Sequence, residues 1–232
     1  MRPRILVTCS LNDHEAATRT LVAYCDPVVT AGGLPLIAPA FTDPAVVAEA
    51  LDHVQGVLLI GGPDYHPEAY GGRPQPVAEL VDRRRHDADL LLARLVMDRD
   101  MPVLGICGGL QALVIAGGGA LVQDIPTDWP NARVHNTPGD DVILHDVRTV
   151  AGTRLQALAG ECFEVNSYHH QAARPDRLGG FTVSAVSDDG IIEAVERADR
   201  RFCLGVQWHP ERMPRSASSL ALFAALIETA QG

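Results

Sequence analysis

Short apolar runs alternate with longer stretches of helical periodicity through the first half of the chain. Apolar runs without polar alternation are typical of parallel strands covered on both faces. Asp43-Pro44 predicts a helix N-cap followed by proline in the first turn, and Pro27 is expected to kink or shorten the first helix. The resulting β-α-β order implies a parallel sheet with right-handed crossovers. The predicted strands are 5–9, 35–38, 56–60 and 102–106, and the predicted helices are about 19–31, 44–53 and 79–98.

The second half is predicted to contain more short strands and few helices. Asp188-Asp189-Gly190 lies between two apolar runs and is typical of a hairpin turn. No internal repeat or linker divides the sequence, so we expect one domain over residues 1–232. The fold class is α/β, flavodoxin-like, with a mostly parallel central sheet flanked by helices and additional short antiparallel strands. The later strands are expected at 142–147, 162–165, 181–186, 191–195 and 203–207, and a last helix at about 217–229.

The composition argues against several classes of function. A net charge of −10 argues against nucleic-acid binding, which needs cations to neutralise phosphates. The sequence contains no lysine, which excludes Schiff-base chemistry and a P-loop. The five cysteines form no CxxC pair, so neither a zinc ribbon nor a disulfide framework is expected. The first apolar run is too short for a signal peptide and no stretch has the length of a membrane span, so we expect a cytoplasmic protein.

The segment Gly105-Ile106-Cys107-Gly108-Gly109 carries the strongest candidate for chemistry. It lies between a predicted strand and a helix expected at 110–116, and small residues on either side allow a sharp strand-to-helix turn. A thiol at a helix N-terminus favours the thiolate form, and the amide of Gly108 points to where an oxyanion would form. An inert buried cysteine at a tight turn is the alternative.

Two further segments provide possible partners for this thiol. His209 and Glu211 end the strand expected at 203–207, and a carboxylate that holds one imidazole nitrogen leaves the other free to accept the thiol proton. The alternative is an exposed histidine beside an incidental acid. Gly61-Gly62 follows the strand 56–60, and Gly62 fits a second oxyanion donor better than a phosphate loop or a plain turn. The carboxyl ends of parallel strands meet at one edge of the sheet, where sites form in α/β proteins.

The motifs GGPD, GICGGLQ and QWHPE in this order resemble the class I glutamine amidotransferase-like superfamily. The match extends to the γ-glutamyl-γ-aminobutyrate hydrolase group, through blocks at 61–71, 102–125, 165–172, 189–193 and 205–211 that span nearly the whole chain. The resemblance implies a triad, an oxyanion hole and a site for the glutamyl α-amino and α-carboxylate groups. The implied residues are Cys107, His209 and Glu211 for the triad, the amides of Gly62 and Gly108 for the oxyanion, and Gln111 with the backbone at His170 and Gln171 for the substrate.

The chain departs from that group at two positions. Gly108 stands where the group usually has arginine, and Val114 where it usually has asparagine, so the identity of the leaving amine stays open. The adjacent His169 and His170 could suggest a metal, but no third ligand has a useful spacing, which favours a structural or substrate-wall role. The run at 83–85, three arginines, is expected to be a solvated helix face rather than an anion-binding site.

The expected reaction is hydrolysis of a small-molecule γ-glutamyl amide through a cysteinyl thioester, with no metal or organic cofactor. One alternative is a glutaminase subunit that delivers ammonia to a separate synthase, which would require a partner protein. Another is a non-catalytic binding protein that retains the fold. Neither nucleic acid nor a membrane is expected as a partner, and formation of a homo-oligomer stays open.

Overall fold

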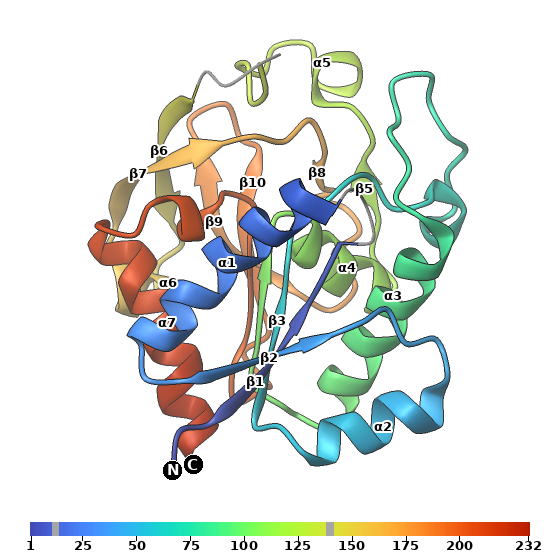
Figure 1. The fold of residues 1–232 in the computed structure, drawn as a ribbon. Coiled ribbons are helices and arrows are strands. Elements are labelled where there is room, and N and C mark those ends of the chain that lie inside the picture. The colour runs from blue at the N-terminus through green and yellow to red at the C-terminus, as the bar shows by residue number, and fades with distance from the viewer. Residues whose placement is uncertain (11–13, 138–141) are drawn as a thin grey trace.

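A nine-stranded sheet runs through the protein in the order β2-β1-β3-β4-β11-β10-β9-β6-β7 (Figure 1). The computed structural model describes residues 1–10, 14–137 and 142–232. The first five strands in this order pair in parallel, and the remaining pairs are antiparallel. The mostly parallel α/β fold with added antiparallel strands is therefore confirmed. The strands of this sheet are β1 (Arg4–Thr8), β2 (Leu34–Ala38), β3 (Gly56–Leu59), β4 (Val103–Ile106), β6 (Ile143–Thr149), β7 (Cys162–Ser167), β9 (Thr182–Ser187), β10 (Ile192–Glu196) and β11 (Cys203–Val206).

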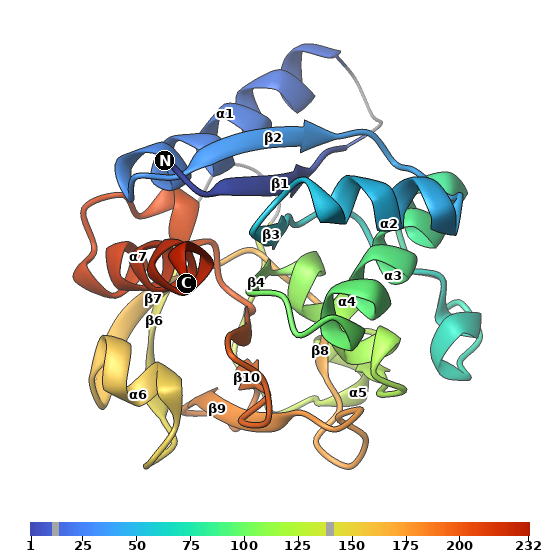
Figure 2. The ribbon, with the colours of Figure 1, turned by 90° about the horizontal axis from the view of Figure 1, so that it is seen from below.

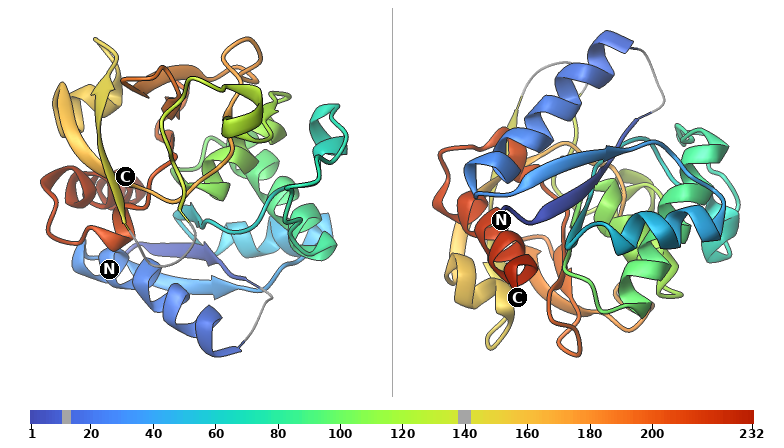
Figure 3. Two further views of the ribbon diagram at one scale, coloured as in Figure 1. Left: turned by 90° about the horizontal axis from the view of Figure 1, so that it is seen from above. Right: turned by 60° about the horizontal axis from the view of Figure 1, so that its bottom comes forward.

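Helices cover both faces of the sheet, as Figure 2 shows from below, and two further views separate the same two groups of helices (Figure 3). Alternate residues of the buried strands supply the two cores. Val57 and Leu59 pack with α2 (Pro44–Asp52), α3 (Arg83–Asp98) and α4 (Gly108–Ala116). Leu58 and Ile60 pack with α1 (His14–Thr30), α6 (Arg154–Ala159) and α7 (Ala217–Gln231). This division follows from the two-residue period of a strand.

Several predicted boundaries need correction. The helix expected from residue 79 begins at Arg83, because residues 79–81 form a parallel bridge with Asp64. Pro27 does not end α1, which continues to Thr30. The helix after Cys107 begins at Gly108 rather than residue 110. Short elements that the pattern missed are η1 (Pro67–Tyr70), β5 (Leu121–Val122), α5 (Ile125–Asp128), α6 (Arg154–Ala159), β8 (Ala172–Ala173) and η2 (Pro210–Arg212).

Other local predictions are confirmed. Asp43 caps α2 by accepting a hydrogen bond from the amide of Ala45 at 2.8 Å. Asp188-Asp189-Gly190 joins the antiparallel strands β9 and β10. No helix in the described ranges is long and apolar enough to cross a membrane.

Candidate active site

Cys107 occupies a sharp turn between β4 and α4. Its backbone has φ 51° and ψ −106°, a left-handed region that a non-glycine residue rarely adopts. The turn has room only for glycine on either side. A Cβ on Gly105 would lie 2.6 Å from the carbonyl group of Gly109, and a Cβ on Gly109 would lie 2.1 Å from the carbonyl oxygen of Leu59. The small residues noted in the sequence are therefore sterically required for this turn.

His209 reaches the thiol because β11 pairs directly with β4. The parallel register aligns Gly205 with Gly105, and the amide of Cys107 donates to the carbonyl of Val206 at 2.8 Å. His209 and Glu211 leave the end of β11, and the ring Nδ1 lies 2.7 Å from Glu211 Oε1. Both side chains are buried. The structure thus brings together the three residues implied for the triad.

Electrostatics in this site favour a thiolate–imidazolium pair. Burial alone would raise the pKa of the Cys107 thiol, but the charge of His209 and a hydrogen bond with it lower that pKa below its usual value. Burial lowers the pKa of His209, whereas Glu211 and Cys107 raise it well above the ordinary range. A thiolate is the nucleophilic form of a cysteine, and an imidazolium can donate a proton.

The loop after β3 lies directly beside the first turn of α4. A Cβ on Gly108 would be only 3.2 Å from the amide nitrogen of Gly62, so the two amides expected as oxyanion donors are neighbours. The amide of Gly108 opens a helix, where the first N–H groups have no intrahelical acceptor. This proximity is the arrangement that the sequence predicted for the two glycines.

Arg85 corrects the prediction that the arginine run is solvated. Arg83 and Arg84 are exposed, but Arg85 is buried and donates to the carbonyl oxygens of Ile60 at 3.3 Å and Gly61 at 2.7 Å. Its Nε also donates to Asp89 Oδ2 at 3.1 Å. Asp89 stands one helical turn after Arg85, but Asp87 has the same spacing from the exposed Arg83, so this pattern alone could not identify the buried arginine. Arg85 therefore holds the candidate oxyanion loop in place through these two carbonyl groups.

Two glutamine side chains lie near the thiol. Gln111, on the second turn of α4, is buried and its amide lies 3.5 Å from Gln207 Oε1. Gln207 was not predicted as a site residue, yet its amide nitrogen lies 3.5 Å from the sulfur of Cys107. Its place at the end of β11, two residues before His209, is the signal that sequence reasoning overlooked.

His170 and Gln171 lie on the segment that follows β7. The His170 ring bridges Asp64 Oδ1 at 3.0 Å and Asp124 Oδ1 at 3.2 Å. The hydrogen bond with Asp64 is the main cause that raises the pKa of His170 to about 9. Gln171 is buried and donates to the carbonyl of Gln123 at 3.0 Å. Both side chains thus hold the loops around the site together, and substrate binding by their backbone stays a prediction.

Asn166 of β7 is a further residue that the sequence did not single out. Its side-chain amide donates to the carbonyl of His209 at 2.9 Å, and its oxygen accepts from the amide of His209 at 2.8 Å. These paired bonds fix the backbone of the candidate base. Val114, one of the two departures from the resembled group, lies on α4 and is buried in the core.

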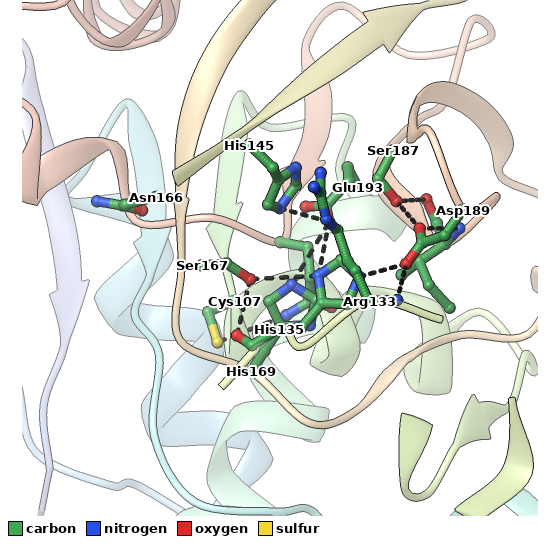
Figure 4. A network of polar contacts seen from close by, with 12 residues as sticks. Cys107, Arg133, His135, His145, Asn166, Ser167, His169, Ser187, Asp189 and Glu193 are labelled. Carbon is green, nitrogen blue, oxygen red and sulfur yellow. Dashed lines mark hydrogen bonds and ion pairs between the residues drawn. The ribbon is translucent and has the colours of Figure 1, made fainter. Parts of the chain in front are cut away.

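His169 does not share the surroundings of His170. It faces His135, His145 and Glu193, which are far apart in sequence (Figure 4). Sequence spacing could not reveal these neighbours, because they come from separate segments, and a structural or substrate-wall role for His169 stays a prediction.

The chain is similar in fold to glutamine amidotransferases of known structure. The glutaminase domain of a CTPS from Trypanosoma brucei, with bound acivicin, matches with a TM-score of 0.69 at 18% identity, over 97% of this chain and 94% of that one. A glutamine amidotransferase from Thermotoga maritima matches with a TM-score of 0.66 at 14% identity, over the whole of both chains. The fold is therefore that of the class I glutamine amidotransferase-like proteins.

Sequence comparison gives the family. The family model for Peptidase C26 matches residues 5–211, and the chain belongs to that family. The γ-glutamyl-γ-aminobutyrate hydrolase PuuD of Escherichia coli is 35% identical over 241 residues, which cover 97% of this chain and 92% of PuuD. The Mycobacterium tuberculosis protein Rv2859c is 41% identical over 211 residues, 90% of this chain and 67% of that protein. Together these relationships define a glutamine amidotransferase-like hydrolase.

Proposed function

We propose that this protein hydrolyses a γ-glutamyl amide bond through a thioester on Cys107. The observation that carries the proposal is the buried relay in which Glu211 lies 2.7 Å from His209, whose charge lowers the pKa of the Cys107 thiol. A carboxylate that orients an imidazole beside a nucleophile is the arrangement that acyl transfer requires. The family relationship to PuuD supports a γ-glutamyl substrate.

In the first step the Cys107 thiolate attacks the γ-carbonyl carbon, and the negative charge passes to the carbonyl oxygen. The amides of Gly62 and Gly108 stabilise that oxyanion. His209 then gives its proton to the leaving nitrogen as the C–N bond breaks, which releases the amine and leaves a γ-glutamyl thioester.

In the second step His209 accepts a proton from water as that water attacks the thioester carbonyl. The tetrahedral intermediate collapses with loss of the C–S bond, which releases glutamate and leaves Cys107 as a thiolate beside protonated His209. This chain's own side chains thus supply the nucleophile, the proton donor and the proton acceptor for both steps.

The test compares release of aniline from a γ-glutamyl anilide by the wild-type chain, Cys107→Ala and Cys203→Ala. Cys203 is a matched control because it is buried on the neighbouring strand β11, and burial raises its thiol pKa to about 12. We expect Cys107→Ala to lose turnover and Cys203→Ala to retain it. Equal turnover by wild type and Cys107→Ala would refute the assignment.

The same preparations separate the two alternatives. Glutamate release from a panel of γ-glutamyl compounds by the purified chain alone supports a hydrolase, whereas release from glutamine only after addition of a partner supports a glutaminase subunit. Iodoacetamide separates either enzyme from a non-catalytic binding protein. An activated Cys107 reacts faster than the other thiols, and a retained but inert site does not.

A further inference from the structure

A second polar cluster lies within the antiparallel half of the molecule. Its members are His135 from the segment after α5, His145 on β6, His169 after β7 and Glu193 on β10. All four are buried, with relative exposures of 3%, 4%, 3% and 0% in that order. The four side chains point toward one another, as Figure 4 shows. The proposed hydrolysis assigns no role to this cluster.

The distances from the three rings to Glu193 suit metal ligands better than hydrogen bonds. Three ring nitrogens surround one carboxylate oxygen, Glu193 Oε1: Nδ1 of His135 at 3.4 Å, Nε2 of His145 at 3.4 Å and Nε2 of His169 at 3.5 Å. A hydrogen bond between nitrogen and oxygen is normally about 2.7–3.2 Å long. Two ligands of a tetrahedral ion at about 2.0–2.1 Å from the metal are about 3.3–3.4 Å apart. One ligand atom from each of His135, His145 and Glu193 lies within 4.8 Å of the others, and His169 is outside this set.

The outward nitrogen of each ring is already hydrogen-bonded to oxygen. Because a carboxylate or a carbonyl oxygen can only accept, each of these nitrogens carries the ring proton in the neutral tautomer, and the inward nitrogen presents a lone pair. Histidines that bind a metal through one nitrogen likewise donate the N–H of the other nitrogen to an oxygen. The three contacts are His135 Nε2 to Asp189 Oδ2 at 3.0 Å, His145 Nδ1 to the carbonyl of Asp146 at 3.2 Å, and His169 Nδ1 to the carbonyl of Gln171 at 2.9 Å.

The inward atoms lack donors. Within the described ranges, Nε2 of His145, Nε2 of His169 and both carboxylate oxygens of Glu193 have no hydrogen-bond partner. Ser167 lies 3.2 Å from Nδ1 of His135 but directs its hydroxyl proton to the carbonyl of His135 at 2.8 Å. Several lone pairs and a carboxylate charge therefore converge in a buried space, an arrangement that is costly unless a cation neutralises it.

We propose that His135, His145 and Glu193 bind one divalent transition-metal ion, with Zn²⁺ the best match. Imidazole and carboxylate are ligands that zinc accepts in tetrahedral geometry, whereas Mg²⁺ and Ca²⁺ prefer sites built only from oxygen. The three ligands are buried, and His169 lies against Glu193 beside them, so the site is structural. The ion would join β6, β10 and the segment around His135.

The proposed metal site lies close to the candidate active site. His169 immediately precedes His170 and Gln171, on which the predicted grip on the glutamyl group depends. Figure 4 draws the sulfur of Cys107 beside this cluster. A metal at this position would fix Glu193, against which His169 lies, without taking part in bond cleavage.

Metal content tests the proposal directly. The chain is expressed without a polyhistidine tag, washed with a weak chelator and analysed by inductively coupled plasma mass spectrometry. We expect about one equivalent of metal per chain in the wild type and a loss of most of it in Glu193→Gln and His145→Asn. His170→Asn is the matched histidine control and should retain the metal, because its ring contacts Asp64 and Asp124 instead.

A second measurement keeps the test decisive where a ligand variant fails to fold. Strong chelation of the wild type should lower Tm, and added Zn²⁺ should restore it. Replacement by Co²⁺ should give the intense visible absorption of a four-coordinate ion. Cys107→Ala should retain both effects. This result would show that the metal is not bound by the reactive thiol, and it does not depend on whether the proposed hydrolysis is correct.

A wild-type protein that contains no metal, binds neither Zn²⁺ nor Co²⁺ and keeps its Tm under chelation would overturn the proposal. Protons shared between the imidazoles and Glu193 would then hold the cluster together. Binding of Zn²⁺ that disappears in Cys107→Ala but persists in Glu193→Gln would overturn it as well.

Discussion

Glu211→Gln provides a sensitive test of the proposed relay, because it removes one charge and keeps the size of the side chain. In the wild type, burial lowers the pKa of His209, but Glu211 and Cys107 raise it to about 10. The contact between His209 Nδ1 and Glu211 Oε1 is 2.7 Å long and buried. Loss of the carboxylate charge should therefore destabilise the imidazolium directly.

The size of the effect follows from the Coulomb energy of a close, buried charge pair. Two unit charges about 4 Å apart interact by about 4 kcal/mol at an effective dielectric constant of about 20. That energy corresponds to about three pH units in the pKa of His209. His209 must be protonated to release the amine, so activity is lost as the pH rises through its pKa. The alkaline limb of the activity profile should move from near pH 10 to about pH 7.

The assay is the pH dependence of kcat/KM for a γ-glutamyl anilide. We also expect kcat to fall, by on the order of 10²–10⁴ at the optimum, because general acid–base catalysis contributes about that much. Glu196→Gln is the matched control. Glu196 is also a buried carboxylate at the end of a strand, but it accepts from the amides of Arg154 and Leu155, far from the thiol along the chain. An alkaline limb that stays in place in Glu211→Gln would refute the reasoning.

Three further predictions concern residues that hold the candidate active site in place. Gly109→Ala places a Cβ 2.1 Å from the carbonyl oxygen of Leu59, so the free energy of unfolding should fall by about 3 kcal/mol or more in urea titrations; an unchanged midpoint would contradict the steric argument. Asn166→Ala removes both hydrogen bonds to the backbone of His209, and kcat should fall more than thermal stability; a loss of stability with normal kcat would exclude this positioning role. Arg85→Met should lower kcat for the anilide but leave the rate of thiol alkylation intact, because the arginine supports the oxyanion loop and not the thiol. Equal losses in both rates would show that the substitution disrupts the whole site.

The sequence predicts the layers of the fold because apolar runs and helical periods are local signals. It also predicts that the ends of β4 and β11 carry chemistry. The step that local signals leave open is strand order. The pairing of Val206 with Ile106 is what turns two separate motifs into neighbours, and it joins residues 100 positions apart. The resemblance to a known group implied that Cys107 and His209 act together, but neither it nor the periodicity predicted which strands pair.

The misread arginine run has a specific physical cause. A sequence shows three adjacent cations, and their charge favours solvent exposure. On a helix, however, successive residues point about 100° apart, so one member of the run can face inward while the others face water. Arg85 faces inward because Asp89 lies one turn later and two carbonyl oxygens lie at the end of β3. Only the tertiary structure identifies those acceptors.

The His169-His170 pair shows the same limit in the segment after β7. Treated as a pair, the two rings predict one shared role, but the two side chains meet different parts of the structure. His170 meets Asp64 and Asp124, while His169 meets Glu193 on β10. A motif that is continuous in sequence thus serves two separate clusters in space. Substitution of His169 should alter the proposed metal cluster, and substitution of His170 should alter the loops beside the thiol, although the two residues are neighbours in the chain.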